Sequence, residues 1–389
     1  MTTKKQLITL TLLFFAWLLA LQVFAYVSTE RVVLSPDKSY EGSIQKYDFL
    51  MHGAFPQNYW QRYDASWYLT VIEHGYSFKE GERSNTVFFP LYPLLVRFAS
   101  FFTGGNAALA GISISTLFAL LSCWLLFLFT KKEYGEQTAW RSIFFFLAFP
   151  VSFFLISIYT ESLFIFLSLA AFLCARSKKW FCATLCVALL TATRVTGLAI
   201  IPALALEYAM QHGYSLRAMF TKKTLLFLLM PLGFFLFLGY QWFAFGDPLT
   251  FLNGQNAWQR NASFSPASIA SKFQQYIHEF SLVADPNSPM PLATRWIDVV
   301  FFILFIAGII LAWFKTSAPL ALFSAGLLAI PLLSGSLLSM ARYMFVAFPL
   351  FIVAGKMVQR PQTLFAILFL STLFLSLFSL MFIQFYWIS

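Results

Sequence analysis

The sequence contains few charged residues for its length. Only 11% of its 389 residues are Asp, Glu, Lys or Arg, whereas 59% are hydrophobic and 20% are aromatic. Water-soluble domains carry roughly a quarter charged residues, so this composition excludes an ordinary soluble domain and predicts a chain that crosses a membrane several times. The net charge of +10 does not indicate nucleic-acid binding, because the basic residues are scattered between apolar segments rather than gathered in a patch.

Cysteine is also scarce, and it forms no pattern typical of a metal site or a disulfide framework. The four cysteines are Cys123, Cys174, Cys182 and Cys186. All fall inside or at the ends of apolar runs, which favours a packing role. We predict no metal site, although Glu73-His74 could join one, and a divalent cation is neither indicated nor excluded. The sequence also has no Walker loop, no dinucleotide fingerprint and no nucleotide-sugar motif.

What the sequence has instead is a series of apolar runs separated by short basic loops. The first run follows Lys4-Lys5 and is long enough for a bilayer, so we expect an uncleaved spanning helix. The expected spans are 6–26, 108–130, 142–157, 160–175, 181–193, 196–210, 224–244, 296–314, 317–335, 343–358 and 362–386. This predicts an all-α polytopic membrane protein with about eleven spans, a cytoplasmic N-terminus and one domain over residues 1–389, because every short inner loop is then basic.

Two longer polar stretches are predicted on the outer side: a first outer loop at 27–107 and a second at 245–295. The apolar segment 86–103 inside the first loop is short and contains Pro90, Pro93 and Arg97. If this segment crossed the membrane, the basic loop at Lys131-Lys132 would lie outside. We therefore expect it to form an interfacial helix on the outer membrane surface.

Ionisable residues gather on this predicted outer side, and such residues at membrane depth are candidates for a functional site. Asp64 is the leading candidate, because an acid in a Trp- and Tyr-rich stretch gains nothing from the membrane interface. The other candidates are Arg62, Glu73, His74, Glu161, Arg194, Asp247, Arg260 and Arg342, with Trp60, Trp67, Tyr68, Tyr92, Trp258 and Tyr343 as aromatic neighbours.

Several of these candidates also have a structural interpretation. Arg194 and Arg342 could extend to lipid headgroups, and Glu161 could pair with an arginine to hold the fold. Asp247 is as well suited to a turn or a helix cap as to a ligand. His74 fits an ordinary loop residue.

The chemistry that fits this set is transfer of a sugar from a lipid phosphate. A phosphate leaving group gains negative charge in the transition state, and arginines are fixed, bidentate donors that stabilise it. The acceptor hydroxyl needs a general base, and partial desolvation among aromatic rings makes a carboxylate more basic. We therefore predict Asp64 as general base. The predicted phosphate ligands are Arg62, Arg194, Arg260 and Arg342; Glu73, His74, Glu161 and Asp247 support the site, and the six aromatic residues line the sugar and lipid clefts.

The order of short motifs along the chain resembles the PIG-V (GPI mannosyltransferase II) family of the GT-C superfamily of polytopic glycosyltransferases. The motifs are Tyr63-Asp64-Ala65-Ser66-Trp67-Tyr68, Glu73-His74-Gly75-Tyr76, Phe88-Phe89-Pro90-Leu91-Tyr92-Pro93, Tyr159-Thr160-Glu161-Ser162, Thr193-Arg194-Val195-Thr196-Gly197, Arg342-Tyr343 and Phe348-Pro349-Leu350. The resemblance implies an inverting transferase that uses a polyprenyl- or dolichyl-phosphate sugar, typically mannose, with Asp64 as the catalytic acid residue of the first outer loop. Family members usually have Trp where this chain has Tyr63.

Two other functions remain open from the sequence. One is a transporter or flippase of a lipid-linked sugar, which would favour broken helices and inverted repeats; the other is a non-catalytic partner subunit. For an enzyme, we expect an unknown glycan or lipid acceptor and a bacterial inner membrane with the active site on the periplasmic face, or the lumenal face of the endoplasmic reticulum in a eukaryote.

Overall fold

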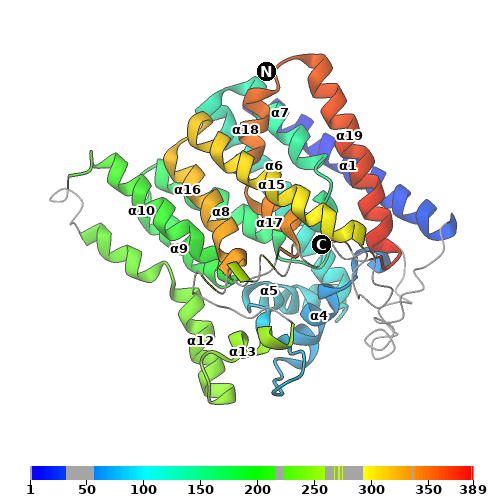
Figure 1. Ribbon diagram of the computed structural model, residues 1–389, viewed down its shortest axis with the longest axis vertical. Helices are drawn as coiled ribbons and strands as arrows, with labels where there is room; N and C mark the ends of the chain where they lie inside the picture. The colour runs from blue at the N-terminus through cyan, green and yellow to red at the C-terminus, as the bar shows by residue number, and fades with distance from the viewer. Residues whose placement is uncertain are drawn as a thin grey trace. The chain divides into compact units, whose positions relative to one another are not determined.

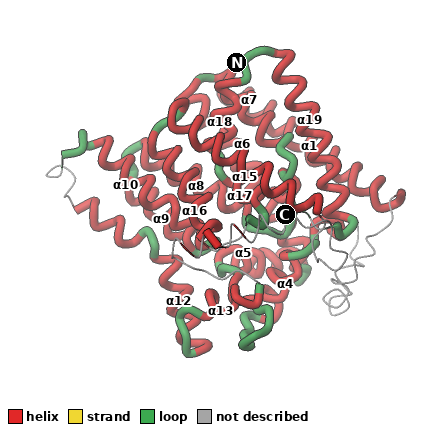
Figure 2. Tube along the Cα trace, viewed as in Figure 1, coloured by secondary structure: helices red, strands yellow, loops and turns green. Residues whose placement is uncertain are grey.

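The computed structural model describes residues 2–31, 57–215, 222–258, 267, 270–271, 274, 292–333, 337–386 and 388. Within these residues every regular element is a helix, as Figure 2 shows. The all-α prediction is therefore confirmed. Arg260 lies outside the described residues, as does most of the predicted second outer loop.

The chain divides into two compact units, each built from segments that are distant in sequence. Unit 1 comprises Met1–Leu69, Leu95–Phe166 and Phe351–Ser389, and unit 2 comprises Thr70–Leu94 and Leu167–Leu350. Four helices continue from one unit into the other along the chain: α4 (Asp64–His74), α5 (Leu91–Ser100), α8 (Glu161–Arg176) and α18 (Pro349–Met357).

Unit 1 is organised around the long helix α6. Its elements are α1 (Thr3–Arg31), η2 (Gln57–Trp60), η4 (Phe101–Thr103), α6 (Ala107–Tyr134), α7 (Glu136–Leu147), η5 (Ser152–Leu155) and α19 (Pro361–Ile383). Helix α6 packs against α1 and α7, and α1 also packs against α19 (Figure 1). Helix α6 begins where the Asn106 side chain accepts a hydrogen bond from the Leu109 amide (2.9 Å). It ends with Lys131 and Lys132 in its last turn, where cations complement the helix dipole.

Unit 2 contains the remaining helices. They are η3 (Asn85–Val87), α9 (Trp180–Thr191), η6 (Val195–Ala199), α10 (Ile200–Gln211), η7 (Lys222–Leu229), α12 (Leu232–Phe245), α13 (Thr250–Ala257), α15 (Leu292–Lys315), α16 (Ala318–Leu333) and α17 (Met340–Val346). Helix α16 packs against α10 and α15, and α9 packs against α12.

An ion pair between a half-buried arginine and a buried glutamate joins three segments of unit 2. The Arg176 Nε atom lies 3.0 Å from Glu207 Oε2, and a terminal nitrogen of Arg176 donates to the Ser317 hydroxyl at 2.6 Å. Gln211 donates to the other oxygen of Glu207 at 2.9 Å. All these residues belong to the predicted inner side, and a buried charge needs such a network to offset its desolvation.

The protein is a multi-pass membrane protein. Five helices among the described residues are long and apolar enough to cross a bilayer, or six if the bent pair α17 and α18 forms one span. On α1, the side chains of Ile8, Leu12, Phe15, Leu19 and Val23 are exposed and follow one face of the helix. A helix whose exposed face is as apolar as its buried face is typical of a lipid environment.

The predicted spans coincide with helices, but many of these helices are short. The five long candidates are Thr3–Thr29, Ala107–Tyr134, Thr224–Phe245, Trp296–Lys315 and Pro361–Ile383. The other expected spans correspond to shorter helices or helix pairs, such as α7 with η5, which are separated at Pro150. The count of about eleven spans therefore stays a prediction.

Helix α5 matches the segment expected to lie on the membrane surface. With η4 it extends over Leu91–Thr103 and is too short to be counted as a span. Leu94, Phe98, Phe101 and Phe102 are exposed along it. An amphipathic helix of this kind suits an interface, and its position on a membrane stays a prediction.

Candidate active site

The backbone takes an unusual conformation immediately before Asp64. Tyr63 has φ +57°, in the left-handed region that non-glycine residues rarely adopt. This conformation costs about 1–2 kcal/mol for an L-residue, so other contacts must hold it. We call residues Arg62–Asp64 the aspartate turn; Asp64, which is half-buried, follows Tyr63 as the first residue of α4.

One hydroxyl group joins the two sides of the aspartate turn. The Tyr159 hydroxyl donates to the Arg62 carbonyl oxygen at 2.8 Å and accepts from the Asp64 backbone N–H at 3.1 Å. The first N–H groups of a helix have no partner inside the helix. Tyr159 therefore supplies, from 95 residues away, the cap that the start of α4 needs.

The segment that carries Tyr159 is itself fixed against α6 and η2. The Ile158 amide donates to the Trp60 carbonyl at 3.3 Å, and Ser115 of α6 lies 3.5 Å from the Tyr159 carbonyl oxygen. Gly111 of α6 allows the close approach, because a Cβ atom there would lie 3.1 Å from the Ile158 side chain. Small residues on α6 thus let the Tyr159 segment pack directly on the helix.

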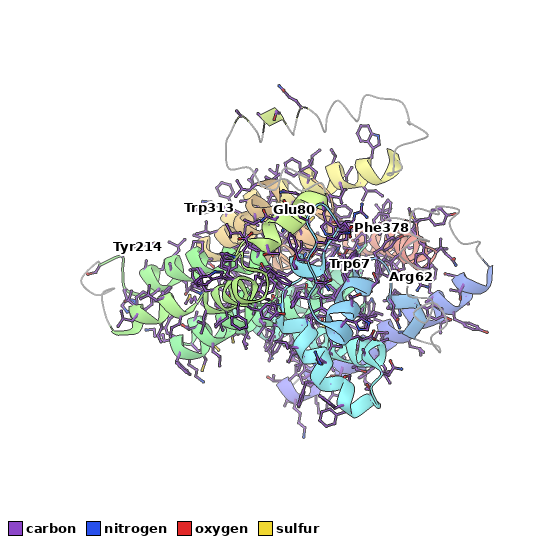
Figure 3. All side chains as sticks on the ribbon, turned by 90° about the horizontal axis from the view of Figure 1, so that it is seen from below. Arg62, Trp67, Glu80, Tyr214, Trp313 and Phe378 are labelled. Carbon is purple, nitrogen blue, oxygen red and sulfur yellow. The ribbon has the colours of Figure 1, made fainter. Side chains whose placement is uncertain are left out.

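Arg62 attaches the aspartate turn to the end of α19. Its Nε donates to the Ile383 carbonyl at 3.0 Å, and its guanidinium lies 4.3 Å from the centre of the Phe385 ring. The Tyr63 ring packs on the same end of α19, with its centre 5.6 Å from that of Phe382. Burial lowers the pKa of Arg62 to about 10, opposed by the neighbouring Tyr63 and Tyr59. Figure 3 labels Arg62 and, on α4, Trp67.

Other predicted site residues of unit 1 are buried in its interior. Glu161 is 0% exposed and lies in the first turn of α8, where the helix dipole favours a carboxylate. Trp60 is also 0% exposed; its indole N–H donates to Gln22 Oε1 at 3.1 Å and its ring stacks on Phe153. Tyr68 of α4 is 5% exposed and meets the Tyr159 ring edge-on.

In unit 2, residues Gly75–Phe89 form a hydrogen-bonded loop, which we call the docked loop. The Tyr76 hydroxyl donates to the Phe88 carbonyl at 2.7 Å. The Asn85 side chain accepts from the Ser77 amide at 2.9 Å and donates to the Gly75 carbonyl at 3.0 Å. Gly75 itself has φ +81°, which explains a glycine at the end of α4. The motifs at 73–76 and 88–93 are therefore joined in space.

The docked loop is attached to α12 and α13 by a buried amide. Gln241 donates to the Thr86 carbonyl at 2.9 Å and accepts from the Phe251 amide at 2.9 Å, and its side chain is 0% exposed. Phe89, at the end of the docked loop, packs against Phe237 of α12 and Phe251 of α13. The predicted first and second outer loops thus pack on one another within unit 2.

Three predicted site residues lie beside the docked loop. Glu73 and His74 are exposed at the end of α4, with His74 Nε2 3.9 Å from Glu73 Oε2. Partial burial raises the pKa of Glu73, and His74 opposes the shift. The Trp258 indole N–H donates to the Ser84 carbonyl at 3.4 Å.

Asp247 acts as a turn residue in the structure. Its carboxylate accepts from the Leu249 amide at 2.9 Å and from the Asn253 side chain at 2.7 Å, at the start of α13. This geometry is the one expected of a turn and cap residue.

Tyr92 of α5, which was predicted to line the sugar and lipid clefts, is 0% exposed.

A second cluster in unit 2 contains two of the four predicted arginines, Arg194 and Arg342. The Arg194 guanidinium lies 5.6 Å from the centre of the Tyr343 ring, a cation–π contact, and Arg342 is 8% exposed in α17. Asp298, which the sequence analysis did not select, is 1% exposed in α15 and accepts from the Met340 amide at 3.0 Å. An aspartate at the start of an apolar span was the signal that could have identified it.

The structure thus brings together Arg62 and Asp64 with Tyr159 in unit 1, and Arg194 with Tyr343 in unit 2. In the part of the chain that the structure describes, no group of three or more His, Cys, Asp or Glu residues could hold a metal ion.

Comparisons with known proteins place the chain in a family. The chain matches the solved Archaeoglobus fulgidus oligosaccharyltransferase complex with zinc and sulfate at 17% identity and a TM-score of 0.39, over 86% of this chain and 48% of that one. It therefore spans about half of that protein's length. No curated protein matches the sequence. The family described as mannosyltransferase (PIG-V) matches residues 6–252. Because this match extends over more than half of the chain and confirms the resemblance seen in the motifs, the protein belongs to the mannosyltransferase (PIG-V) family.

Proposed function

We propose that the protein is a membrane glycosyltransferase that moves mannose from a polyprenyl- or dolichyl-phosphate donor to a hydroxyl of a glycan or lipid acceptor. Membership of a mannosyltransferase family supports the sugar, and the lack of a nucleotide-binding motif supports a lipid-borne donor. The observation that carries the proposal is the aspartate turn, where a half-buried carboxylate follows a left-handed tyrosine. Backbone conformations of this kind occur often at functional sites.

In the proposed reaction Asp64 is the general base. Its carboxylate takes the proton of the acceptor hydroxyl while that oxygen forms a bond to the anomeric carbon of the sugar. The bond between the anomeric carbon and the phosphate oxygen breaks, and its electron pair leaves with the polyprenyl phosphate. Attack opposite to the leaving group inverts the anomeric centre. Trp67, which follows Asp64 on α4 and is half-buried, is proposed to contact the sugar.

Arg194 and Arg342 are proposed to bind the donor phosphate. Both guanidinium groups carry a fixed positive charge that stabilises the negative charge gained by the leaving phosphate. Arg62 is less suited to this role, because its Nε already donates to Ile383 of α19 and one face of its guanidinium packs on the Phe385 ring. Arg260 remains a further candidate, and Tyr343 orients Arg194 through their cation–π contact.

The remaining groups of the proposed site have supporting roles. Glu73, His74 and Glu161 are proposed as supporting polar residues, and Trp258, beside the docked loop, is proposed to contact the lipid part of the donor. We place the active site on the outer, periplasmic face of a bacterial inner membrane, or on the lumenal face of the endoplasmic reticulum in a eukaryote, because the short loops on the opposite side are basic.

The test is replacement of Asp64 by asparagine, which keeps the size of the side chain and removes its ability to accept the proton. Transfer of radiolabelled mannose from polyprenyl-phosphate mannose would be measured with membrane extracts of the source cells as acceptors. We expect kcat to fall at least about a hundredfold, the contribution typical of a general base. The matched control is Glu80→Gln, because Glu80 is an exposed carboxylate of the docked loop (Figure 3).

Near-normal turnover by correctly folded Asp64→Asn protein would remove Asp64 from the mechanism. Accumulation of the donor inside sealed vesicles without any covalent product would instead show a transporter.

A further inference from the structure

The Tyr159 hydroxyl contacts the backbone on both sides of Tyr63. Tyr159 is 1% exposed and lies between η5 and α8. Its oxygen donates to residue 62 and accepts from residue 64. The Arg62 carbonyl and the Asp64 N–H can both form a hydrogen bond with one oxygen atom because Tyr63, the residue between them, is left-handed at φ +57°.

The Tyr159 ring is held firmly enough to impose this geometry. Its centre lies 4.9 Å from that of Phe154, 6.2 Å from that of Phe382 and 6.3 Å from that of Tyr68. Its backbone is attached to η2 and α6 through Ile158 and Ser115. A ring packed on several sides has little freedom to move with the turn, so the turn must adapt to the hydroxyl.

The position of this contact matters for the carboxylate. The Tyr159 hydroxyl bonds the N–H of Asp64 itself, so it fixes the backbone atom next to the side chain that the proposed reaction uses. The Ala65 amide also donates to the Arg62 carbonyl at 3.2 Å. Removal of the Tyr159 hydroxyl therefore leaves fewer contacts to hold the turn, and Tyr63 then shifts toward the right-handed or extended conformations that tyrosine prefers. That relaxation rotates the start of α4 and moves the carboxylate away from the acceptor.

We infer that Tyr159 is a positioning residue of the transferase, whose hydroxyl holds Tyr63 in the left-handed conformation and thereby directs the Asp64 carboxylate at the acceptor hydroxyl. The inference rests on the proposed function of Asp64. Tyr159 touches neither donor nor acceptor in this role; it acts through Asp64 alone.

The first experiment is Tyr159→Phe, which removes one oxygen atom and leaves the packed ring. In the assay with polyprenyl-phosphate mannose we expect kcat to fall tenfold to about a hundredfold, the loss typical of a misplacement of about 1 Å. The KM for the donor should change little, because no donor contact is lost. The matched control is Tyr76→Phe, which also removes a tyrosine hydroxyl from a backbone carbonyl, that of Phe88, but in the docked loop of unit 2 rather than at the aspartate turn.

The second experiment separates positioning from general stability by combining Tyr159→Phe with Asp64→Asn. A group that acts only through Asp64 can add no further loss once the carboxylate is gone. We therefore expect the double variant to have the same kcat as Asp64→Asn alone. Independent losses that multiply would overturn the inference, as would a Tyr159→Phe protein that keeps the kcat of the Tyr76→Phe control.

A third variant tests the conformation of Tyr63 itself. Glycine adopts the left-handed conformation without strain, so the loss caused by Tyr159→Phe should be smaller in a Tyr63→Gly background; an equal or larger loss would count against the inference. The two proposals fail differently. A damaged Asp64→Asn with a normal Tyr159→Phe overturns the positioning role alone, whereas a near-normal Asp64→Asn overturns the base and the positioning role together.

Discussion

The aspartate turn and the docked loop are neighbours in sequence but are held in different ways. In the docked loop the left-handed positions are glycines, Gly75 and Gly81, and buried or partly buried amides satisfy the backbone. In the aspartate turn the left-handed residue is Tyr63, and a distant tyrosine hydroxyl satisfies the backbone. The docked loop thus avoids backbone strain, while the aspartate turn keeps it.

This difference indicates which of the two regions is specialised for structure. A loop that only has to pack can use glycine, because nothing requires a side chain at the strained position. The aspartate turn instead keeps a tyrosine whose ring packs on Phe382 and Phe385, so strain and packing are combined at the residue before Asp64. Strain of this kind persists where surrounding contacts over-determine the conformation.

The largest expected effect tests the amide that holds the docked loop. Gln241→Leu leaves the Thr86 carbonyl and the Phe251 amide buried without this partner. We expect the free energy of unfolding in detergent to fall by about 2–4 kcal/mol, since each orphaned buried group costs roughly 1–3 kcal/mol. Gln359→Leu removes an exposed amide that donates to the Lys356 carbonyl and should change stability little. Equal effects of the two substitutions would show that the docked loop does not depend on Gln241.

The next effect tests whether glycine is needed at the left-handed position. Gly75→Ala places a Cβ in open space, so its cost is the backbone conformation alone, about 1 kcal/mol. Gly239→Ala in α12 also meets open space, but there the backbone is helical. It should stabilise the protein by about 0.5–1 kcal/mol. The two substitutions therefore differ in sign, and the same sign for both in thermal unfolding would contradict the assignment at Gly75.

The smallest effect measures the strain at Tyr63 directly. Tyr63→Ala and Tyr63→Gly both remove the ring contacts with Phe382 and Phe385, but only alanine keeps the left-handed penalty. We expect the glycine variant to be about 1 kcal/mol more stable than the alanine variant. The order found at ordinary positions, with alanine more stable, would mean that the turn relaxes when the ring is lost.

The sequence predicted the elements better than the contacts between them. Apolar runs placed the long helices, such as α6 and α19, because a spanning helix must be continuously apolar. The motifs identified the family, while the role of Asp64 stays a prediction. Hydrophobicity could not show how many of the short helices cross the membrane. The apolar run 142–157, for example, folds as the end of α7 and the separate short helix η5, with a break between them.

The supporting contacts had no sequence signal. A left-handed tyrosine is not indicated by its residue type, and the partners of the aspartate turn lie 95 and 321 residues away. Gln241 and Asp298 looked like isolated polar residues in or near apolar helices, although each binds a backbone group in a distant segment. Periodicity reports which face of a helix is buried, and it contains no information about which distant group a buried side chain will meet.

The bond from Arg62 to the Ile383 carbonyl has a consequence for biosynthesis. Ribosomes deliver the chain from its amino end at roughly 5–20 residues per second, so the 321 residues between the two partners emerge over tens of seconds. During that interval the guanidinium of Arg62 has to be solvated by water or by lipid phosphates. The aspartate turn is therefore completed late in translation, and a chain that stops before α19 contains inserted first helices but lacks the carbonyl group that binds Arg62.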